Sequence, residues 1–423
     1  MNKYLQIFKI PDLRNKVLMV LFLLLTFRLL AAIPIPGVDA AKLSQFFSSN
    51  QAFGFLNLFS GGGLSTLSVV MLGVGPYITA TIIMQLLTIV FPSLKKAYYE
   101  EGAEGMAKFN RISRYITVPL AMLQAYGFIN LLMSQGVISP LPFSELLTNV
   151  IVITAGSVLL MWIGELISEY KIGNGVSLII FAGIVSRLPQ QIGAGALSFS
   201  AADVPTYIAF LVVSLIVIAG VVYINEGERK VPVSYAKQVR GNKMYGGVST
   251  YLPLRVNQAG VIPIIFAISL LLLPQFFAQA VTIFSKTFAA QVNTFVSGFF
   301  SNIVLYSAIY FALVVIFTYF YTAITFDPEE ISKNLQKSGG FIPGIRPGQA
   351  TTTAIAKIVN RVTFFGALFL GVIAILPNIT QIVTGAKALA LGGTALLIVV
   401  AVALEVMKQI ESQLTVREYE GIL

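Results

Sequence analysis

The 423-residue sequence contains no cysteine and no histidine, and it has only one tryptophan. Without Cys and His, the chain cannot form disulfides, Cys/His zinc sites, thiol nucleophiles or histidine-based acid–base catalysts. Charge is scarce as well, because charged residues make up only 11% of the chain, against roughly 25% in soluble domains. Hydrophobic residues make up 56%, and so apolar a chain would expose large hydrophobic patches in water. The composition therefore predicts a membrane protein.

Ten apolar stretches predict transmembrane helices, since a helix needs roughly 20 apolar residues to cross the hydrocarbon core. The fifth stretch is short, so its length alone leaves a re-entrant segment open. We interpret it as a span because the basic loops fall on one side of the membrane only if it crosses. The sequence thus predicts an all-α polytopic membrane protein with ten transmembrane helices, near residues 17–33, 69–91, 115–134, 147–167, 176–191, 206–224, 258–277, 302–325, 359–377 and 392–410.

Basic residues predict the orientation of these spans. The chain has 28 Lys and Arg against 18 Asp and Glu. Most of the basic residues lie before the first span, after the second, fourth, sixth and eighth spans, or at the end of the chain. The positive-inside rule then predicts that both termini are cytoplasmic.

Acidic residues are almost absent from the predicted spans. Glu165 and Glu405 fall at the cytoplasmic ends of their spans, whereas pumps and transporters carry acids deeper in the membrane as proton or ion relays. The sequence also lacks a Walker A motif and an H-E-x-x-H motif. We therefore predict that the chain is not an enzyme, holds no metal or cofactor, and takes any energy for work from a partner.

Two predicted spans share the pattern G-V-x-P-x-I. It occurs at Gly73–Ile78 in the second span and at Gly260–Ile265 in the seventh. These are corresponding positions if the chain consists of two five-span halves. Paired Gly/Pro interruptions in corresponding helices indicate a functional centre at the interface of a repeat. Coincidence stays open, because Gly and Pro are common in membrane helices.

The stretch Gly54–Gly63 is apolar but too short to cross a membrane. It must lie at the membrane surface or dip back into protein, because bare backbone cannot face lipid. A loop on the surface is one interpretation. The other is a mobile stopper with a hinge at Gly61–Gly63.

Two predicted cytoplasmic loops, 225–257 and 326–358, are much longer than ordinary connections. In the first, the alternation around Val231, Val233 and Tyr235 predicts a short hairpin. In the second, several Gly and Pro residues surround Arg346 and fix an irregular backbone. Basic loops near a membrane contact anionic lipid, but the length of these loops favours docking of a soluble partner.

With these motifs the sequence resembles the SecY family, which forms the central subunit of the bacterial protein-conducting channel. The resemblance covers essentially the whole chain. It rests on F-S-G-G-G-L-S from Phe59, G-V-G-P-Y-I-T-A-T-I-I-M-Q-L-L from Gly73, K-I-G-N-G-V-S-L-I-I-F-A-G-I from Lys171, S-T-Y-L-P-L-R-V-N-Q-A-G-V-I-P from Ser249, G-G-F-I-P-G-I-R-P-G from Gly339 and G-G-T-A-L-L-I-V-V from Gly392.

The resemblance implies a pore closed by a ring of aliphatic side chains. Such a constriction dewets and excludes ions, and it has no charge that would trap a passing polypeptide. Two of the ring positions carry valine where isoleucine is common in the family. The matching residues are Val74, Ile78, Val176, Ile180, Ile265 and Ile398.

The resemblance also implies a plug, a lateral gate and docking sites. The re-entrant plug, at about 55–66, seals the closed pore externally and includes Phe55, Leu56, Asn57, Leu58, Phe59, Ser60, Gly61, Gly62, Gly63, Leu64 and Ser65. The lateral gate, between spans two and three and spans seven and eight, includes Gln85 and Asn257. Docking of the SecA motor and of ribosomes falls to Arg229, Lys230, Tyr235, Lys237 and Arg346.

From the resemblance we expect two pseudo-symmetric five-helix halves, residues 1–200 (1–170 and 171–200) and 201–423. The implied function is translocation of unfolded secretory polypeptides and release of membrane segments into lipid. The implied partners are SecE-type and SecG-type subunits, the SecA ATPase, the ribosome, precursor polypeptides and lipids, with no nucleic acid except through the ribosome. The implied location is the bacterial plasma membrane. A secondary transporter for a small solute is the alternative, but it predicts charged ligands at mid-membrane, which the spans lack.

Overall fold

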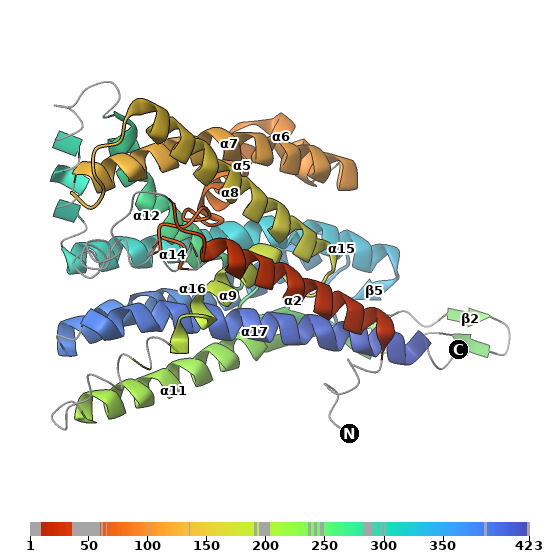
Figure 1. Ribbon diagram of the computed structural model, residues 1–423. Coiled ribbons are helices and arrows are strands. Elements are labelled where there is room, and N and C mark those ends of the chain that lie inside the picture. Colours follow the sequence, from red (N-terminus) through yellow and green to blue (C-terminus); the bar gives the residue numbers. More distant parts are fainter. Residues whose placement is uncertain are drawn as a thin grey trace. The chain divides into compact units, whose positions relative to one another are not determined.

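The computed structural model describes residues 10–35, 60, 62–64, 66–99, 101–134, 136–189, 193, 204–235, 238–240, 243–245, 249–281, 291–292, 294–296, 298–299, 302–384 and 387–420. The protein is mostly helical (Figure 1). The helices are α2 (Pro11–Ala31), α5 (Gly75–Val90), α6 (Pro92–Tyr99), α7 (Gly102–Ser134), α8 (Phe143–Glu169), α9 (Gly175–Val185), α11 (Val204–Glu226), α12 (Ile262–Val281), α14 (Ile303–Thr325), α15 (Pro328–Lys337), α16 (Gln349–Thr384) and α17 (Lys387–Glu420).

Each predicted span overlaps one of these helices. Among the described residues, four helical segments are long and apolar enough to cross a membrane, or up to five if the bent pair Gly75–Thr88 and Pro92–Tyr98 is one span. The helices α9 and α12 have shorter apolar segments, Gly175–Val185 and Ile262–Leu271. The protein therefore has several membrane-spanning helices, and the full count of ten stays a prediction.

The second predicted span begins later than its apolar composition suggested. Residues 69–74 form turns, and α5 begins only at Gly75. Gly73 has a left-handed φ of 59°, which ends any helix that approaches from the N-terminal side. Pro76 then occupies the first turn of α5, where its missing N–H costs no hydrogen bond.

The seventh predicted span begins in the same way. Gly260 has a φ of 61°, and Pro263 is the second residue of α12. Backbone bonds close the first turn in both places: Ile78 N donates to Val74 O at 3.0 Å, and Ile265 N donates to Val261 O at 3.3 Å. The shared motif is therefore a helix start, not a break inside a helix as its sequence position suggested.

By their internal contacts the residues group into two compact units. Unit 1 comprises Met1–Pro205, Ile268–Tyr306 and Val402–Leu423. Unit 2 comprises Thr206–Ala267 and Ser307–Ala401. The division into two five-helix halves stays a prediction.

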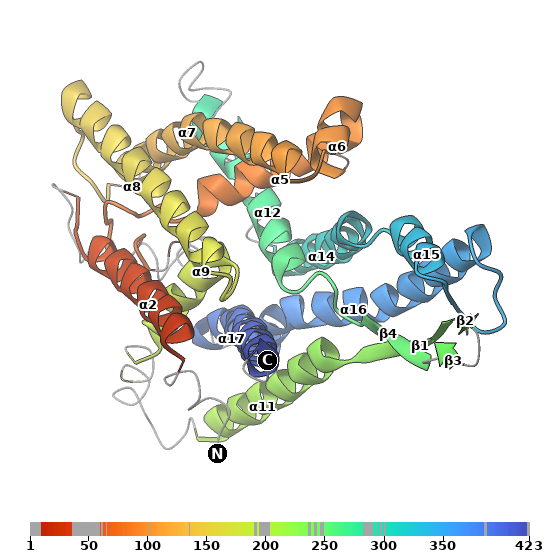
Figure 2. The same ribbon diagram turned by 90° about the vertical axis from the view of Figure 1, so that its right-hand side faces the viewer.

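In unit 1, α7 packs against α5, α6 and α8, and α8 packs against α9. Figures 1 and 2 both show α5 and α6 beside α7. The backbones of α8 and α9 approach closely, since a Cβ on Gly175 would lie only 1.8 Å from the carbonyl oxygen of Gly164. A buried cluster that includes Leu67, Met71, Phe128 and Ile153 connects the turns before α5 with α7 and α8. The start of α5 is therefore fixed on several sides.

In unit 2, the two long loops that were predicted separately form one small structure. The strand β1 (Glu228–Tyr235) lies between β4 (Ser249–Arg255) and β5 (Gly340–Phe341), and all pairs are antiparallel. Figure 2 shows β1 and β4 side by side. The connection between them carries a second hairpin of β2 (Gln238–Arg240) and β3 (Lys243–Tyr245). Because β5 comes from the second loop, the sheet joins the two loops.

The sheet rests on α15 and α16 through a common apolar core, which we call the cytoplasmic core. It contains Val231, Leu254, Ile342, Ile355 and Val359 as its buried members. Further along α16, Gly366 lies against the backbone of Val256, because a Cβ there would be 2.6 Å from the carbonyl oxygen of Val256. One long helix thus contacts both the sheet and the connection that leads into α12.

Candidate functional site

The predicted pore residues occupy helix starts and buried faces in both units. In unit 1, Val74 is the N-cap of α5 and Ile78 lies one turn later, with exposures of 0% and 5%. Val176 and Ile180 lie one turn apart in α9. Ile180 is buried and Val176 is half-buried.

The other two predicted pore residues, Ile265 in α12 and Ile398 in α17, are buried in unit 2. Because the six residues are divided between the two units, their assembly into one ring stays a prediction. All six side chains are aliphatic. Val74 and Ile78 lie one turn apart at the start of α5, and Val176 and Ile180 lie one turn apart in the N-terminal half of α9.

Most of the described part of the predicted plug is buried, and it is anchored at its C-terminal end. Ser60, Gly62, Gly63 and Leu64 are buried and Thr66 is exposed, whereas 55–59, Gly61 and Ser65 lie outside the described chain. Ser60 Oγ accepts a hydrogen bond from Leu64 N at 3.0 Å. Leu64 is 2% exposed and belongs to the buried cluster of unit 1. These residues therefore pack into protein.

An arginine far along the chain holds this end of the segment. Arg187, just after α9, donates from Nη2 to the carbonyl oxygen of Gly62 at 2.9 Å. Gly62 has a φ of 92°, and a Cβ on it would lie 2.4 Å from Arg187 Nε. The backbone conformation therefore favours glycine, and a side chain at this position would also have to displace the guanidinium group of Arg187. Sequence reasoning missed Arg187, although a single arginine that ends an apolar run was a usable signal.

The end of the predicted plug and the residues that follow it are also held by hydrogen bonds to the end of α2 and the residues after it. Ile35 N donates to Leu67 O at 2.8 Å, and Val69 N donates to Ile33 O at 3.0 Å. The hydroxyl of Thr66 donates to Ala31 O at 3.1 Å. The residues that follow the predicted hinge are therefore attached to the C-terminal end of α2 and the residues after it.

The two predicted gate amides are both buried, with exposures of 7% each, but their surroundings differ. Asn257 Nδ2 donates to Asn225 Oδ1 at 2.7 Å and to Gly260 O at 3.1 Å. Gln85 lies inside α5, and its Oε1 has no hydrogen-bond partner among the described residues; the Oδ1 of Asn257 has none there either. The two residues belong to different units, so their meeting at a gate stays a prediction.

The predicted docking residues lie on the small structure formed by the two long loops. Arg229 and Lys230 are exposed on β1, and Tyr235 at its end is half-buried. Lys237 lies outside the described residues. The alternation predicted for this strand is confirmed, because Val231 and Val233 are buried between exposed neighbours.

Arg346 is exposed in a tight turn that follows β5. The turn is held by a hydrogen bond from Thr351 Oγ1 to Arg346 O at 2.9 Å and by one from Ser332 Oγ to Gly348 O at 2.9 Å. The left-handed glycines of the turn, Gly344 and Gly348, have φ values of 82° and 101°. Arg346 therefore lies on a backbone that hydrogen bonds hold in place. It follows β5, which belongs to the same sheet as β1, the strand of Arg229.

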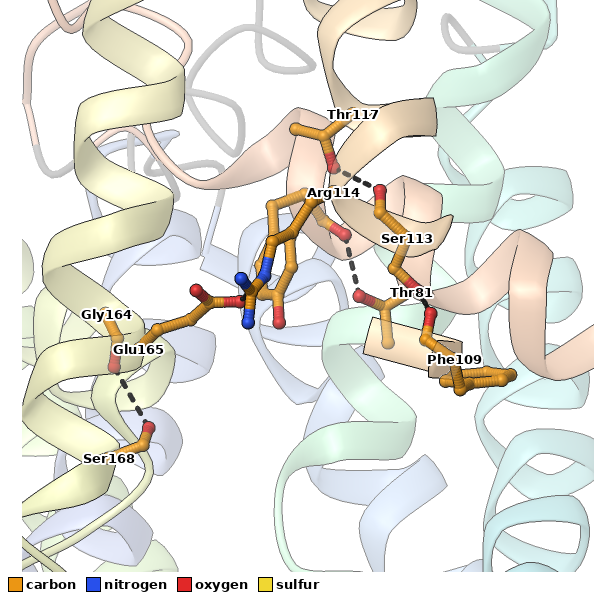
Figure 3. Close-up of polar contacts among 9 residues, drawn as sticks. Thr81, Phe109, Ser113, Arg114, Thr117, Gly164, Glu165 and Ser168 are labelled. Atoms are coloured by element: carbon orange, nitrogen blue, oxygen red, sulfur yellow. Dashed lines mark hydrogen bonds and ion pairs between the residues drawn. The ribbon is translucent and has the colours of Figure 1, made fainter. Parts of the chain in front are cut away.

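The acidic residue at the end of the fourth predicted span has a basic partner. Arg114 Nε on α7 donates to Glu165 Oε1 on α8 at 2.8 Å (Figure 3). Nearby, Ser168 Oγ donates to Gly164 O at 3.0 Å and accepts from Gly175 N at 2.9 Å. The ion pair joins α7 to the last turns of α8, and Ser168 joins the end of α8 to the start of α9. Glu165 therefore has a structural explanation.

No group of three or more acidic, His or Cys side chains that could hold a metal ion occurs among the described residues. The candidate functional features are instead aliphatic residues at helix starts, glycines in the predicted plug and a small sheet with exposed basic side chains. Comparison with known proteins shows which family shares them.

The SecY family model matches residues 68–407. The chain belongs to the SecY family. Among its relatives, the protein translocase subunit SecY of Corynebacterium glutamicum is 43% identical, and that of Mycobacterium tuberculosis is 42% identical. Each of these alignments covers 100% of both chains. SecY of Streptomyces coelicolor is 42% identical, also over 100% of both chains.

Solved structures of the SecY type share the fold. A structure described as that of a protein conducting channel aligns with a TM-score of 0.64 at 20% identity, over 93% of this chain and 90% of that chain. A structure concerned with the plug domain of SecY aligns with a TM-score of 0.63 at 20% identity, over 92% and 90%. Sec61 from a canine ribosome-channel complex gives 0.60 at 20% identity, over 93% and 90%.

Proposed function

We propose that this chain forms the protein-conducting channel of a bacterial Sec translocase. It translocates unfolded secretory polypeptides and releases transmembrane segments sideways into lipid. The observation that carries this function is full-length similarity to translocase SecY subunits at 40% identity and above. The same similarity favours the channel over a secondary transporter.

Inside the channel, Val74, Ile78, Val176, Ile180, Ile265 and Ile398 form the constriction. Two glycine–proline helix starts with matching geometry, one in each unit, support this assignment. Aliphatic side chains offer no hydrogen bonds to a passing polypeptide, and they exclude ions from a narrow pore by dewetting. A chain of any sequence therefore slides through without being bound.

The plug, about residues 55–66, seals this constriction externally and moves about its anchored glycine end. Gln85 and Asn257 belong to the lateral gate between spans two and three and spans seven and eight. Buried amides between membrane helices are worth only about 1 kcal/mol each, which suits a seam that opens and closes.

The chain is not an enzyme, so the energy comes from a partner. SecA or a ribosome docks on the sheet that carries Arg229, Lys230, Tyr235 and Lys237, and on the turn of Arg346. The joining of the two loops in one sheet supports a single docking surface. SecE-type and SecG-type subunits complete the complex in the plasma membrane, with both termini of this chain cytoplasmic, ten spans and two five-helix halves.

The test is reconstitution into liposomes with a SecE-type subunit, SecA, ATP and a precursor protein. We expect ATP-dependent protection of the precursor from external protease, and its loss when this chain is left out. If partners that work with another SecY give no protection with this chain, the channel function is wrong. Saturable uptake of a small solute would then support the transporter.

A further inference from the structure

One face of α16 is exposed. Its side chains are mostly polar or basic up to Arg361 and apolar from Phe364 onward. The opposite face packs through Ile355 and Val359 into the cytoplasmic core. The exposed face carries an open groove of about 740 Å³. The groove is lined by Thr353, Ala356, Lys357, Asn360, Arg361, Phe364 and Phe365.

The polar part of this groove has positive charge without a negative counterpart. Lys357 and Arg361 are four residues apart, so they lie on the same face of the helix with their Cβ atoms about 6 Å apart. The sequence contains no Asp or Glu between Glu330 and Glu405. Among the described residues, no ion pair includes either side chain, whereas Arg114 pairs with Glu165. The pair is thus complementary to an anion.

The apolar part of the groove continues into a surface that suits hydrocarbon. Phe364 and Phe365 are 48% and 68% exposed, and their rings pack edge to face with ring centroids 5.8 Å apart. Val372 and Ile379, 48% and 44% exposed, follow Phe365 at intervals of seven residues on the same face. With a rise of 1.5 Å per residue, this stripe extends for about 21 Å.

The position of the cations along the helix matches the level of lipid headgroups. The segment Gln349–Leu376 is long and apolar enough to cross a membrane. Residues 362–386 carry no charge, and Lys and Arg side chains near the end of an apolar membrane segment extend to the headgroups, which places Lys357 and Arg361 at that level. Arg361 lies about one turn before Phe365, and Lys357 lies about 12 Å before it along the axis. A phosphate between the two cations would therefore be in register with an acyl chain on the stripe.

We propose that this face of α16 binds an anionic glycerophospholipid. The phosphate lies between Lys357 and Arg361, the amide of Asn360 adds a hydrogen bond, and one acyl chain lies over Phe365, Val372 and Ile379. Free phosphate would use only the cations, and the apolar stripe continuous with them selects the lipid. The proposal does not depend on translocation activity.

A tryptophan reporter tests this site in the full-length protein. Trp162 is the only tryptophan in the sequence and is 57% exposed on α8, so Trp162→Phe with Phe365→Trp leaves one reporter at the groove. The protein is reconstituted in phosphatidylcholine vesicles with increasing fractions of dibrominated phosphatidylglycerol or dibrominated phosphatidylcholine. Bromine quenches tryptophan on contact. We expect the brominated phosphatidylglycerol to quench at a lower fraction, by about fivefold for each cation in the site.

Charge variants decide whether the preference belongs to this site. Lys357→Gln with Arg361→Gln should abolish it, and Arg361→Lys should keep most of it because the charge remains. The matched control is Lys95→Gln with Lys96→Gln on α6, which removes the same charge from exposed positions and should leave the preference intact. Circular dichroism and gel filtration establish that each variant is folded.

Several results would overturn the proposal. Equal quenching by both lipids means an unselective lipid annulus, and a preference that survives the double variant or disappears in the control means general surface charge. Absence of quenching by either lipid means that protein covers this face. A preference abolished by inorganic phosphate, but not by chloride at equal ionic strength, means that the cations bind free phosphate.

Discussion

The two helix starts with the G-V-x-P-x-I pattern are alike in backbone but differ in what precedes them. In unit 1, α5 follows the hinge that Arg187 holds at Gly62. In unit 2, α12 follows β4 and the turn fixed by Asn257. Both glycines have a φ near 60°. The same backbone geometry thus connects a predicted pore helix to the predicted plug in the first case and to the predicted docking surface in the second.

This difference indicates that the two units use the same helix start, and that the segment preceding the helix determines its role. If so, damage to the attachment in unit 2 should affect driven transport, and damage in unit 1 should affect the tightness of the closed channel. Damage to the start itself should lower stability in both units.

The largest effect is expected at the docking turn. Arg346→Glu should block SecA-driven translocation while insertion of membrane segments continues, because it reverses the charge of the exposed arginine on a fixed turn. Protease protection of a precursor measures the first activity, and carbonate-resistant insertion measures the second. Lys337→Glu at the end of the neighbouring α15 is the matched charge reversal and should retain most translocation. Normal translocation by Arg346→Glu would remove this residue from the mechanism.

A large effect is also expected at the predicted plug. Deletion of Leu56–Ser65 should raise the ion leak of reconstituted vesicles without abolishing transport, because the aliphatic constriction remains. Arg187→Gln should raise the leak less, since it removes the guanidinium bond to Gly62 O but leaves the segment itself in place. Lys387→Gln, which makes the same charge change at the start of α17, is the control. Vesicles that stay equally tight with the deletion would contradict the plug assignment.

A moderate effect is expected at the helix starts. Gly260→Val should destabilise the protein by about 1–2 kcal/mol, because a β-branched residue at positive φ is strained. Gly260→Asn should cost less, since asparagine tolerates this conformation. The space around a new Cβ at Gly260 is open, so the comparison isolates backbone strain. Denaturant titration in detergent measures both variants, and equal stabilities would mean that the left-handed φ is not maintained.

The smallest effects separate the two gate amides. Asn257→Leu should destabilise unit 2 by about 1 kcal/mol, because it removes the bonds to Asn225 and Gly260. Gln85→Leu should be neutral or stabilising, since the Oε1 of Gln85 is buried without a partner among the described residues. The same denaturant titration tests both. A larger loss for Gln85→Leu than for Asn257→Leu would contradict the expectation that the bonds donated by Asn257 Nδ2 matter more than Gln85.

The sequence predicted features that depend on local pattern. Helices overlap all the predicted spans, and the alternation of Val231 and Val233 marked β1. The apolar run before Gly75 misled the prediction of where α5 begins, because hydrophobicity alone does not report a left-handed glycine.

Features that depend on distant partners could not be read from the sequence. Arg187 and Gly62 are 125 residues apart in the sequence, and no motif near either residue indicates that the two are in contact. The strand β5 has only two residues, too few to show alternation, so the joining of the two loops was not predicted. The meeting of the pore and gate residues depends on the arrangement of the two units and stays a prediction.

The close approach of Gly366 to Val256 has a mechanical consequence. The helix α16 is 36 residues long, or about 54 Å, and it lies under the sheet at one end and against the residue before Asn257 further along. With no side chain at Gly366, little slack separates the two backbones. The sheet and the residues before α12 are therefore packed against the same helix, so the sheet cannot shift relative to the start of α12 without disturbing its contacts along α16.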